Sequence, residues 1–305
     1  MTIAPQAADP GDAATASRTR ATRALPALLL GAMCIGLSGI FVKLSEVGPQ
    51  ANAFFRIAGA APFYWAFLAL VPGSRTRARI DPRQWRLLLL ASLVVVGDYA
   101  CWHVSLKLTS VANSTLLANL VPIFVALHAA LFLGKSPRRL FLLAMAITLS
   151  GAALLLGGSL SLSADRALGD GLGVVTAMFY AAYVVIVAEL RTRMTTATLM
   201  AWTGTIAGPL FLPLAFLFDE LILPRSLEGW TTVLALILVC QVAGSGLIAY
   251  ALAHMPTTFS SLTLLAQPVF SALAAWAILG ERLGTGELLG GALVLAGIYL
   301  ARRAS

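Results

Sequence analysis

Charged residues are scarce in this chain. Asp, Glu, Lys and Arg make up 11% of its 305 residues, whereas hydrophobic residues make up 59%. An ordinary soluble domain carries about 25% charged residues. A chain this apolar cannot hide its side chains in one aqueous core, which excludes the soluble classes and predicts an integral membrane protein.

Cysteine is also rare, and several motifs of enzyme chemistry are missing. Cys34, Cys101 and Cys240 all fall in apolar segments without metal-ligand spacing, so we expect free thiols, no metal and no cofactor. No H-E-x-x-H, G-x-S-x-G or Walker sequence occurs. Asp98 follows VVG, which lacks the first glycine of the G-x-G-D run of intramembrane aspartyl proteases. These absences favour a protein that is not an enzyme.

Long apolar runs, by contrast, fill most of the chain. A helix needs about 20 residues to cross the hydrocarbon core of a bilayer. Runs of this kind occur at 25–44, 51–71, 86–106, 109–133, 139–158, 170–190, 197–218, 230–252, 257–279 and 286–301. Gly, Pro or charged residues separate them. The sequence therefore predicts an all-α membrane protein with ten transmembrane helices.

The distribution of Lys and Arg predicts the orientation of these spans, because cytoplasmic loops carry an excess of both. With a cytoplasmic N-terminus, 15 of the 21 Lys and Arg residues fall on the inside and four in outer loops. We therefore expect both termini in the cytoplasm and a bacterial-type inner membrane as the location. The net charge of +8 is interpreted as a topology signal, and nucleic acid is not an expected partner.

The chain divides into a tail and two similar halves. Residues 1–24, rich in Ala, Thr, Pro and Asp, are predicted to form a disordered cytoplasmic tail. Residues 25–158 and 170–303 each contain five spans and align without a gap at an offset of 146, where Pro122 falls on Pro268. Because five is odd, the second half must enter the membrane from the opposite side. Such inverted repeats build alternating access around a midplane site.

The sequence resembles the drug/metabolite transporter superfamily, EamA type. The clearest residues are TSVANSTLLANLVPIFVALHAALFLGK (109–135) and PTTFSSLTLLAQPVFSALAAWAILGERLGTGELLGGALVLAG (256–297). The second stretch has the family's Gly280-Glu281 ending, whereas the first has Gly134-Lys135. The resemblance implies ten spans in paired five-helix repeats, a central route formed by spans 1–4 and 6–9, and peripheral spans 5 and 10. Similar proteins export amino acids and other small metabolites.

Polar residues at membrane depth are candidates for the transport route, because each charge there costs roughly 2.5–3.5 kcal/mol. Asp98 lies near the middle of the third span, with Trp102 on its face and Tyr99 and His103 on the neighbouring face. The Asp98 carboxylate could hold a substrate ammonium or carry a proton. Alternatively, it could pair with Arg56 or Lys43 and hold helices together.

Two repeat-related sites flank the span prolines. Thr115 and Asn119 precede Pro122, and Thr263 and Gln267 precede or adjoin Pro268. A proline frees the carbonyl four residues back, and a polar side chain or a ligand can then satisfy it. Hydrogen bonding between helices through Asn and Gln is the alternative.

Further polar and small residues occur in the second half. Gln241 and Tyr183 could face the same route, with Tyr180 as an aromatic wall. Asp170, in LGDGLG, is expected to act as a helix N-cap. Gly286-x-x-x-Gly290 permits close helix approach, within one chain or in a homodimer, and the oligomeric state stays open.

These features together predict a secondary transporter that exports amino acids or similar small metabolites by alternating access. A central acid would bind an ammonium group, amide side chains would bind a carboxylate, and aromatic walls would contact an apolar group. The expected partners are a small zwitterionic substrate and the lipid bilayer. An uncoupled facilitator and, less favoured, an intramembrane enzyme are the alternatives. Substrate identity, direction and coupling ion are not encoded in any motif of the sequence.

Overall fold

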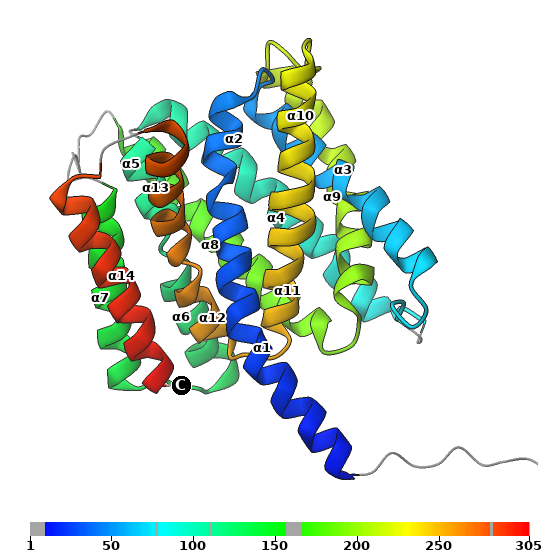
Figure 1. Ribbon diagram of the computed structural model, residues 1–305, viewed down its shortest axis with the longest axis vertical. Helices are drawn as coiled ribbons and strands as arrows, with labels where there is room; N and C mark the ends of the chain where they lie inside the picture. Colours follow the sequence, from blue (N-terminus) through cyan, green and yellow to red (C-terminus); the bar gives the residue numbers. More distant parts are fainter. Residues whose placement is uncertain (1–9, 77–78, 110, 157–165, 281–282, 305) are drawn as a thin grey trace, which may run out of the picture.

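Figure 1 shows the computed structural model, which describes residues 10–76, 79–109, 111–156, 166–280 and 283–304. Every regular element within these ranges is a helix. Eight helical stretches among them are long and apolar enough to cross a membrane, and the apolar helix α7 (Arg139–Leu155) is shorter. The predicted all-α membrane fold is confirmed.

Each repeat makes five helical passes in the part of the chain that the structure describes. The first contains α1 (Pro10–Gly36), α2 (Ser38–Leu44), α3 (Pro49–Leu70), α4 (Pro82–Leu108), α5 (Val111–Ala118), α6 (Val121–Leu133) and α7. The second contains α8 (Ala167–Arg191), α9 (Thr196–Phe218), α10 (Leu227–Ala235), η2 (Leu236–Ser245), α11 (Gly246–Leu252), α12 (Thr257–Thr263), α13 (Ala266–Leu279) and α14 (Thr285–Ala304). Several passes are therefore built from two or three consecutive helices.

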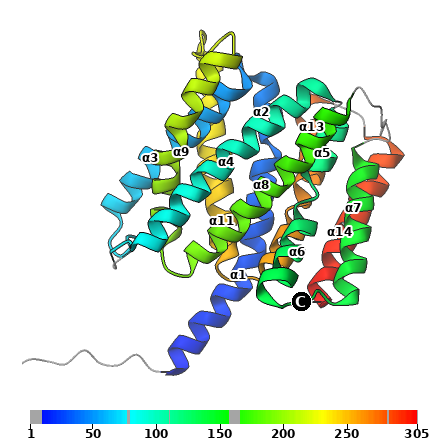
Figure 2. The same cartoon turned by 180° about the vertical axis from the view of Figure 1, so that it is seen from behind.

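The two repeats enter the bundle from opposite ends. The start of α1 and the C-terminus lie at the same end, as both views show (Figures 1 and 2). We call it the arginine-rich end, since residues 71–76, residues 191–195 and the end of α14 are there. Helix α4 runs away from it, and Leu108 at the end of α4 contacts Gly169 at the start of α8. Helix α8 therefore begins at the opposite end, and the second repeat is inverted.

Helix α1 begins before the first apolar run. It starts at Pro10, so residues 10–24 are helical although their composition predicts a disordered tail. Alanine has the highest helix propensity, and proline is well tolerated in the first turn because its missing N–H needs no partner there. Residues 1–9 of the predicted tail lie outside the described residues.

Pro122 and Pro268 each follow a break in their helix, whereas Pro26, Pro62, Pro209 and Pro213 lie inside helices that continue past them. In the first repeat α5 ends at Ala118 and α6 begins at Val121, and in the second α12 ends at Thr263 and α13 begins at Ala266. Proline removes one helical N–H and clashes with the carbonyl four residues back. Pro122 and Pro268 act in this way at matching places, so the offset alignment predicts a real structural correspondence.

Helices α7 and α14 form an antiparallel pair at one edge of the bundle (Figures 1 and 2). Glycines allow the close approach, because a Cβ at Gly290 would lie 2.5 Å from the Leu155 backbone nitrogen. A Cβ at Gly297 would lie 2.9 Å from the Ala144 carbonyl oxygen. Gly290 therefore packs within the chain, and spans 5 and 10 are peripheral as the resemblance implies.

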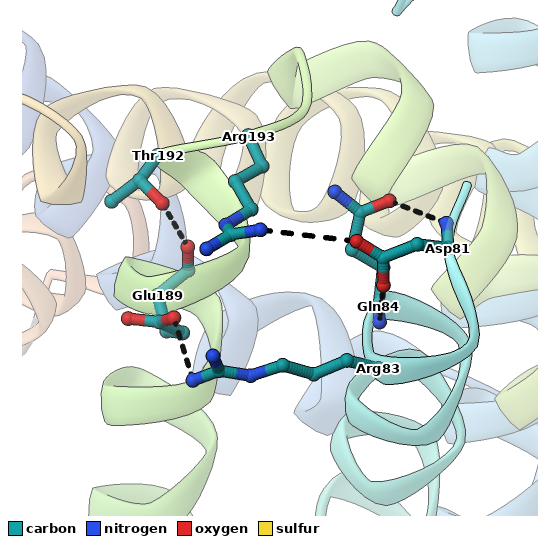
Figure 3. Close-up of polar contacts among 6 residues, drawn as sticks. All are labelled: Asp81, Arg83, Gln84, Glu189, Thr192 and Arg193. Atoms are coloured by element: carbon teal, nitrogen blue, oxygen red, sulfur yellow. Dashed lines mark hydrogen bonds and ion pairs between the residues drawn. The ribbon is translucent and has the colours of Figure 1, made fainter. Parts of the chain in front are cut away.

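Polar contacts join the two repeats at the arginine-rich end. Figure 3 shows that Arg83 on α4 pairs with Glu189 on α8 at 3.2 Å. Arg193 reaches Asp81 at 3.8 Å. The Asp81 carboxylate also accepts from the Gln84 backbone N–H, and the Gln84 side chain accepts from the Asp81 N–H, which forms a capping box at the start of α4. A groove of about 830 Å³ lies beside these contacts, between residues 67–76 and 191–197.

Candidate functional site

Polar side chains from five helices converge inside the bundle. They lie within electrostatic or hydrogen-bonding range of one another. We call them the central cluster: Arg56 on α3, Asp98 and Tyr99 on α4, Tyr180 and Tyr183 on α8, Gln241 on η2, and Gln267 on α13. Both repeats contribute, as expected for a site between inverted halves.

Arg56 is the cation of the central cluster. It is 9% exposed, and its Nε donates a hydrogen bond to Gln241 Oε1 at 3.0 Å. Its guanidinium carbon lies 5.8 Å from the centre of the Tyr99 ring, a distance typical of a cation–π contact. Gln241 of the second repeat and Tyr99 of the first therefore both orient the guanidinium.

Asp98 is the carboxylate of the central cluster. It is half-buried and lies within electrostatic range of Arg56. Among the described residues, however, the Asp98 carboxylate forms no ion pair and accepts no hydrogen bond. The direct pairing with Arg56 that the sequence leaves open is therefore not formed, and the Lys43 side chain lies outside the described residues.

Tyrosines and an amide form another wall of the cluster. Tyr99, Tyr180 and Tyr183 all lie within electrostatic range of Arg56. The Tyr180 hydroxyl contacts the side chain of Gln267. The Gln267 Nε2 atom is buried and forms no hydrogen bond of normal geometry with the described residues, although its amide lies beside Tyr180. Such an unpaired buried donor is costly in a fold unless something else accepts its hydrogen bond.

A π-helical segment positions Gln241. Helix η2 is wound as a π-helix, a form that is rare and is frequent at functional sites. The Tyr64 hydroxyl donates to the Val242 carbonyl at 2.7 Å and lies 3.3 Å from the Gln241 carbonyl. A Cβ at Gly246 would lie 2.6 Å from that hydroxyl. Glycine there lets Tyr64 approach the wide turn and donate to the Val242 carbonyl.

The other predicted site residues lie apart from the cluster or at its margin. Trp102 is half-buried and contacts the His103 ring, and His103 is buried beside the Tyr99 ring. Thr263 is fully buried and donates to the Phe259 carbonyl within its own helix. Thr115 and Asn119 are half-buried at the break between α5 and α6. Five predicted residues, Asp98, Tyr99, Tyr183, Gln241 and Gln267, are brought together.

Asp170 has a different role from the predicted one. The N-cap position of α8 belongs to Arg166, and Asp170 lies in the first turn. Its carboxylate accepts hydrogen bonds from Thr109 Oγ1 at 2.6 Å and from Asn113 Nδ2 at 3.3 Å. It therefore joins the end of α4 and the start of α5 to the start of α8. The contact joins the two repeats.

Sequence reasoning considered Arg56 only as a structural partner for Asp98, and it missed Tyr64. The signal for Arg56 was present, because an arginine within an apolar span is a candidate functional group by itself. Tyr64 had no comparable signal, since one tyrosine in a span is common near membrane interfaces. Tyr64 donates its hydrogen bond to the π-helix η2 of the other repeat, a contact that the sequence around Tyr64 does not indicate.

The chain belongs to the EamA-like transporter family. The sequence model of that family matches residues 22–157 and again residues 167–303. The two matched segments correspond to the two inverted repeats. The chain is therefore a multi-pass membrane protein of a transporter family.

Relatives agree with this assignment, and a solved structure has a similar fold. An uncharacterized transporter of Archaeoglobus fulgidus is 28% identical over 270 residues, covering 86% of this chain and 91% of that protein. The pseudopaline exporter CntI of Pseudomonas aeruginosa is 26% identical over 269 residues, covering 87% and 91%. A crystal structure with 19% identity has a TM-score of 0.76 and covers 92% of this chain and 98% of its own. At that identity it supports the fold alone.

Proposed function

We propose that this transporter exports amino acids or similar small zwitterions by alternating access, with the central cluster as its binding site. The arginine-rich end faces the cytoplasm in this proposal, in agreement with the excess of Lys and Arg there. Both termini are then cytoplasmic, and the membrane is the inner membrane of a bacterial-type cell. The opposite end receives the released substrate.

The observation that carries the proposal is the convergence of Asp98 with amide and aromatic side chains from both repeats. The Asp98 carboxylate forms no direct ion pair among the described residues, and a substrate ammonium would supply one. Tyr99, Tyr180 and Tyr183 supply aromatic rings that an apolar group could contact. Similarity to a protein named as an exporter supports the outward direction.

The proposal is tested by flux into proteoliposomes with purified protein and the Asp98→Asn variant. A counterflow screen with labelled amino acids, nucleosides and sugars first identifies which class is exchanged, and we expect amino acids. The variant keeps the side-chain volume and removes the charge. We expect a loss of roughly 30-fold or more in flux, the size seen when one member of a buried charged contact is removed.

A matched control is Glu228→Gln, which removes a carboxylate from an exposed position in the first turn of α10. It should transport as the unmodified protein does. Unchanged flux in Asp98→Asn, at equal protein incorporation, would remove Asp98 from the mechanism. A pH gradient imposed on loaded vesicles separates coupled transport from facilitation, because only coupled transport moves substrate uphill.

A further inference from the structure

The terminal nitrogens of the Arg56 guanidinium have no hydrogen-bond acceptor in the described part of the chain. Among the described residues its one hydrogen bond runs from Nε to Gln241, which leaves both terminal nitrogens without an acceptor. The side chain is 9% exposed. An arginine this buried ordinarily pairs with an acid or with several carbonyls, because burial of an unpaired charge is costly.

An acid lies close by and is also unpaired. Asp98 is within electrostatic range of Arg56, yet the two form no ion pair, and Asp98 accepts no hydrogen bond from the described residues. A cation and an anion held near each other but separated are complementary to a ligand that carries both charges. The terminal guanidinium nitrogens have the fork geometry that matches a carboxylate bidentately.

We propose that Arg56 is the carboxylate-binding residue of the site, and that Arg56 and Asp98 together select substrates with a carboxylate and an ammonium on one carbon. This rests on the proposed function and deepens it, because the sequence assigned the carboxylate to amide side chains. Gln241 instead positions Arg56 through its hydrogen bond to Nε. Tyr99, in cation–π contact with the guanidinium, borders the same position.

The geometry accounts for the unpaired donor of Gln267 as well. Its Nε2 is buried without a partner, and its side chain touches Tyr180 within the cluster. A carboxylate has about four lone-pair positions, so it can accept from Arg56 and from a neighbouring amide. The ligand class is therefore a free amino acid or a compound with an amino-acid head group, rather than an amine, a sugar or a nucleoside.

The test uses three probes of similar size in proteoliposomes: leucine, leucinamide, which lacks the carboxylate, and isocaproate, which lacks the ammonium. Uptake of each is measured for the unmodified protein, Arg56→Gln, Arg56→Lys and Asp98→Asn. We expect the unmodified protein to prefer leucine over both analogues by roughly 30-fold or more. In Arg56→Gln the preference over leucinamide should collapse to near unity while the preference over isocaproate persists.

In Asp98→Asn the preference over isocaproate should collapse while the preference over leucinamide persists. Arg56→Lys should restore part of the preference over leucinamide that Arg56→Gln loses. Arg86→Gln, which removes an exposed guanidinium on α4, is the matched control and should keep both preferences. A structural role for Arg56 would lower uptake of all three probes equally, so the ratio identifies binding even if the variant is less stable.

A preserved leucine-to-leucinamide ratio in Arg56→Gln overturns the inference, as does an unmodified protein that takes up both equally. If the protein exchanges other screened metabolites but no compound with a carboxylate, the inference fails while transport stands. If it exchanges none of the screened compounds, the proposed function fails and the inference falls with it.

Discussion

The two ends of the bundle join the two repeats by different means. At the arginine-rich end, the Arg83–Glu189 pair has side chains that are 67% and 43% exposed, and the Arg193–Asp81 pair 52% and 42%. At the opposite end, carboxylates accept hydrogen bonds from backbone N–H groups: Asp219 from Ala51 at 2.6 Å, and Glu46 from Arg225 at 2.7 Å. Every one of these contacts crosses from one repeat to the other.

This difference between ion pairs and backbone hydrogen bonds predicts which contacts break more readily. Exposed ion pairs contribute about 0–1 kcal/mol and weaken in salt. The contact of Asp219 with the Ala51 N–H is part-buried, and hydrogen bonds to charged groups contribute about 1.5–3 kcal/mol. The two ion pairs at the arginine-rich end are thus weaker than the Asp219 contact, and a groove of about 830 Å³ lies beside them.

The largest expected effect comes from Gly48→Ala at the opposite end. A methyl group there would lie 2.3 Å from the Asp219 Cγ atom, so Asp219 must leave the Ala51 N–H. We expect a loss of about 3 kcal/mol in the free energy of unfolding, measured as thermal unfolding in detergent. Gly171→Ala is the control, because no atom lies within 4 Å of the added carbon. Equal melting of both variants would contradict the role of this contact.

Asp219→Ala tests the same contact without adding an atom. The Ala51 N–H and the positive end of α3 lose their acceptor, which should cost about 1–2 kcal/mol. Thermal unfolding measures the change, and Glu220→Ala, at the exposed neighbouring position, should have little effect. A variant as stable as the unmodified protein would show that water replaces the carboxylate at no cost.

The pH dependence of stability should differ in sign between two carboxylates at the opposite end. Hydrogen bonds from the Ser226 side chain and the Arg225 and Ser226 N–H groups lower the pKa of Glu46, whereas burial raises the pKa of Asp219. Glu46 therefore contributes stability above its unfolded pKa of about 4.3, and this is lost as the pH falls through its lower folded pKa. The Asp219 contribution instead declines as the pH rises from its unfolded pKa towards its higher folded pKa.

Melting temperature against pH for Glu46→Gln and Asp219→Asn separates the two contributions. Relative to the unmodified protein, Glu46→Gln should lose stability at neutral pH and close the gap in acid. Asp219→Asn should instead lose stability in acid, and its melting temperature should approach that of the unmodified protein as the pH rises. Parallel curves for both variants would mean that neither carboxylate titrates differently in the folded protein.

The smallest expected effect is at the arginine-rich end. A double-mutant cycle with Arg83→Gln and Glu189→Gln should give a coupling energy below about 1 kcal/mol, because both side chains are exposed. The coupling should vanish at high ionic strength. A coupling above that of the Asp219 contact would reverse the comparison between the ends.

The site was partly predictable from the sequence. Asp98, Gln241 and Gln267 stand out because polar groups are costly in apolar spans, and all three are in the central cluster. Thr263 looked equivalent to them but donates to its own helix, and spacing alone cannot distinguish a hydroxyl that faces a route from one that faces a carbonyl. Gln241, which accepts the hydrogen bond from Arg56, lies 185 residues away in the sequence. No local sequence pattern therefore links these two residues.

The sequence by itself determined the membrane class, the long apolar helices, the repeat and the matching breaks before Pro122 and Pro268. These are local or periodic properties, set by hydropathy along one helix and by the missing N–H of proline. Only the tertiary structure decided that Arg56 and Asp98 lie near each other without pairing, and that Tyr64 supports a π-turn on the other repeat. Both depend on how inverted halves pack side by side, which no single segment encodes.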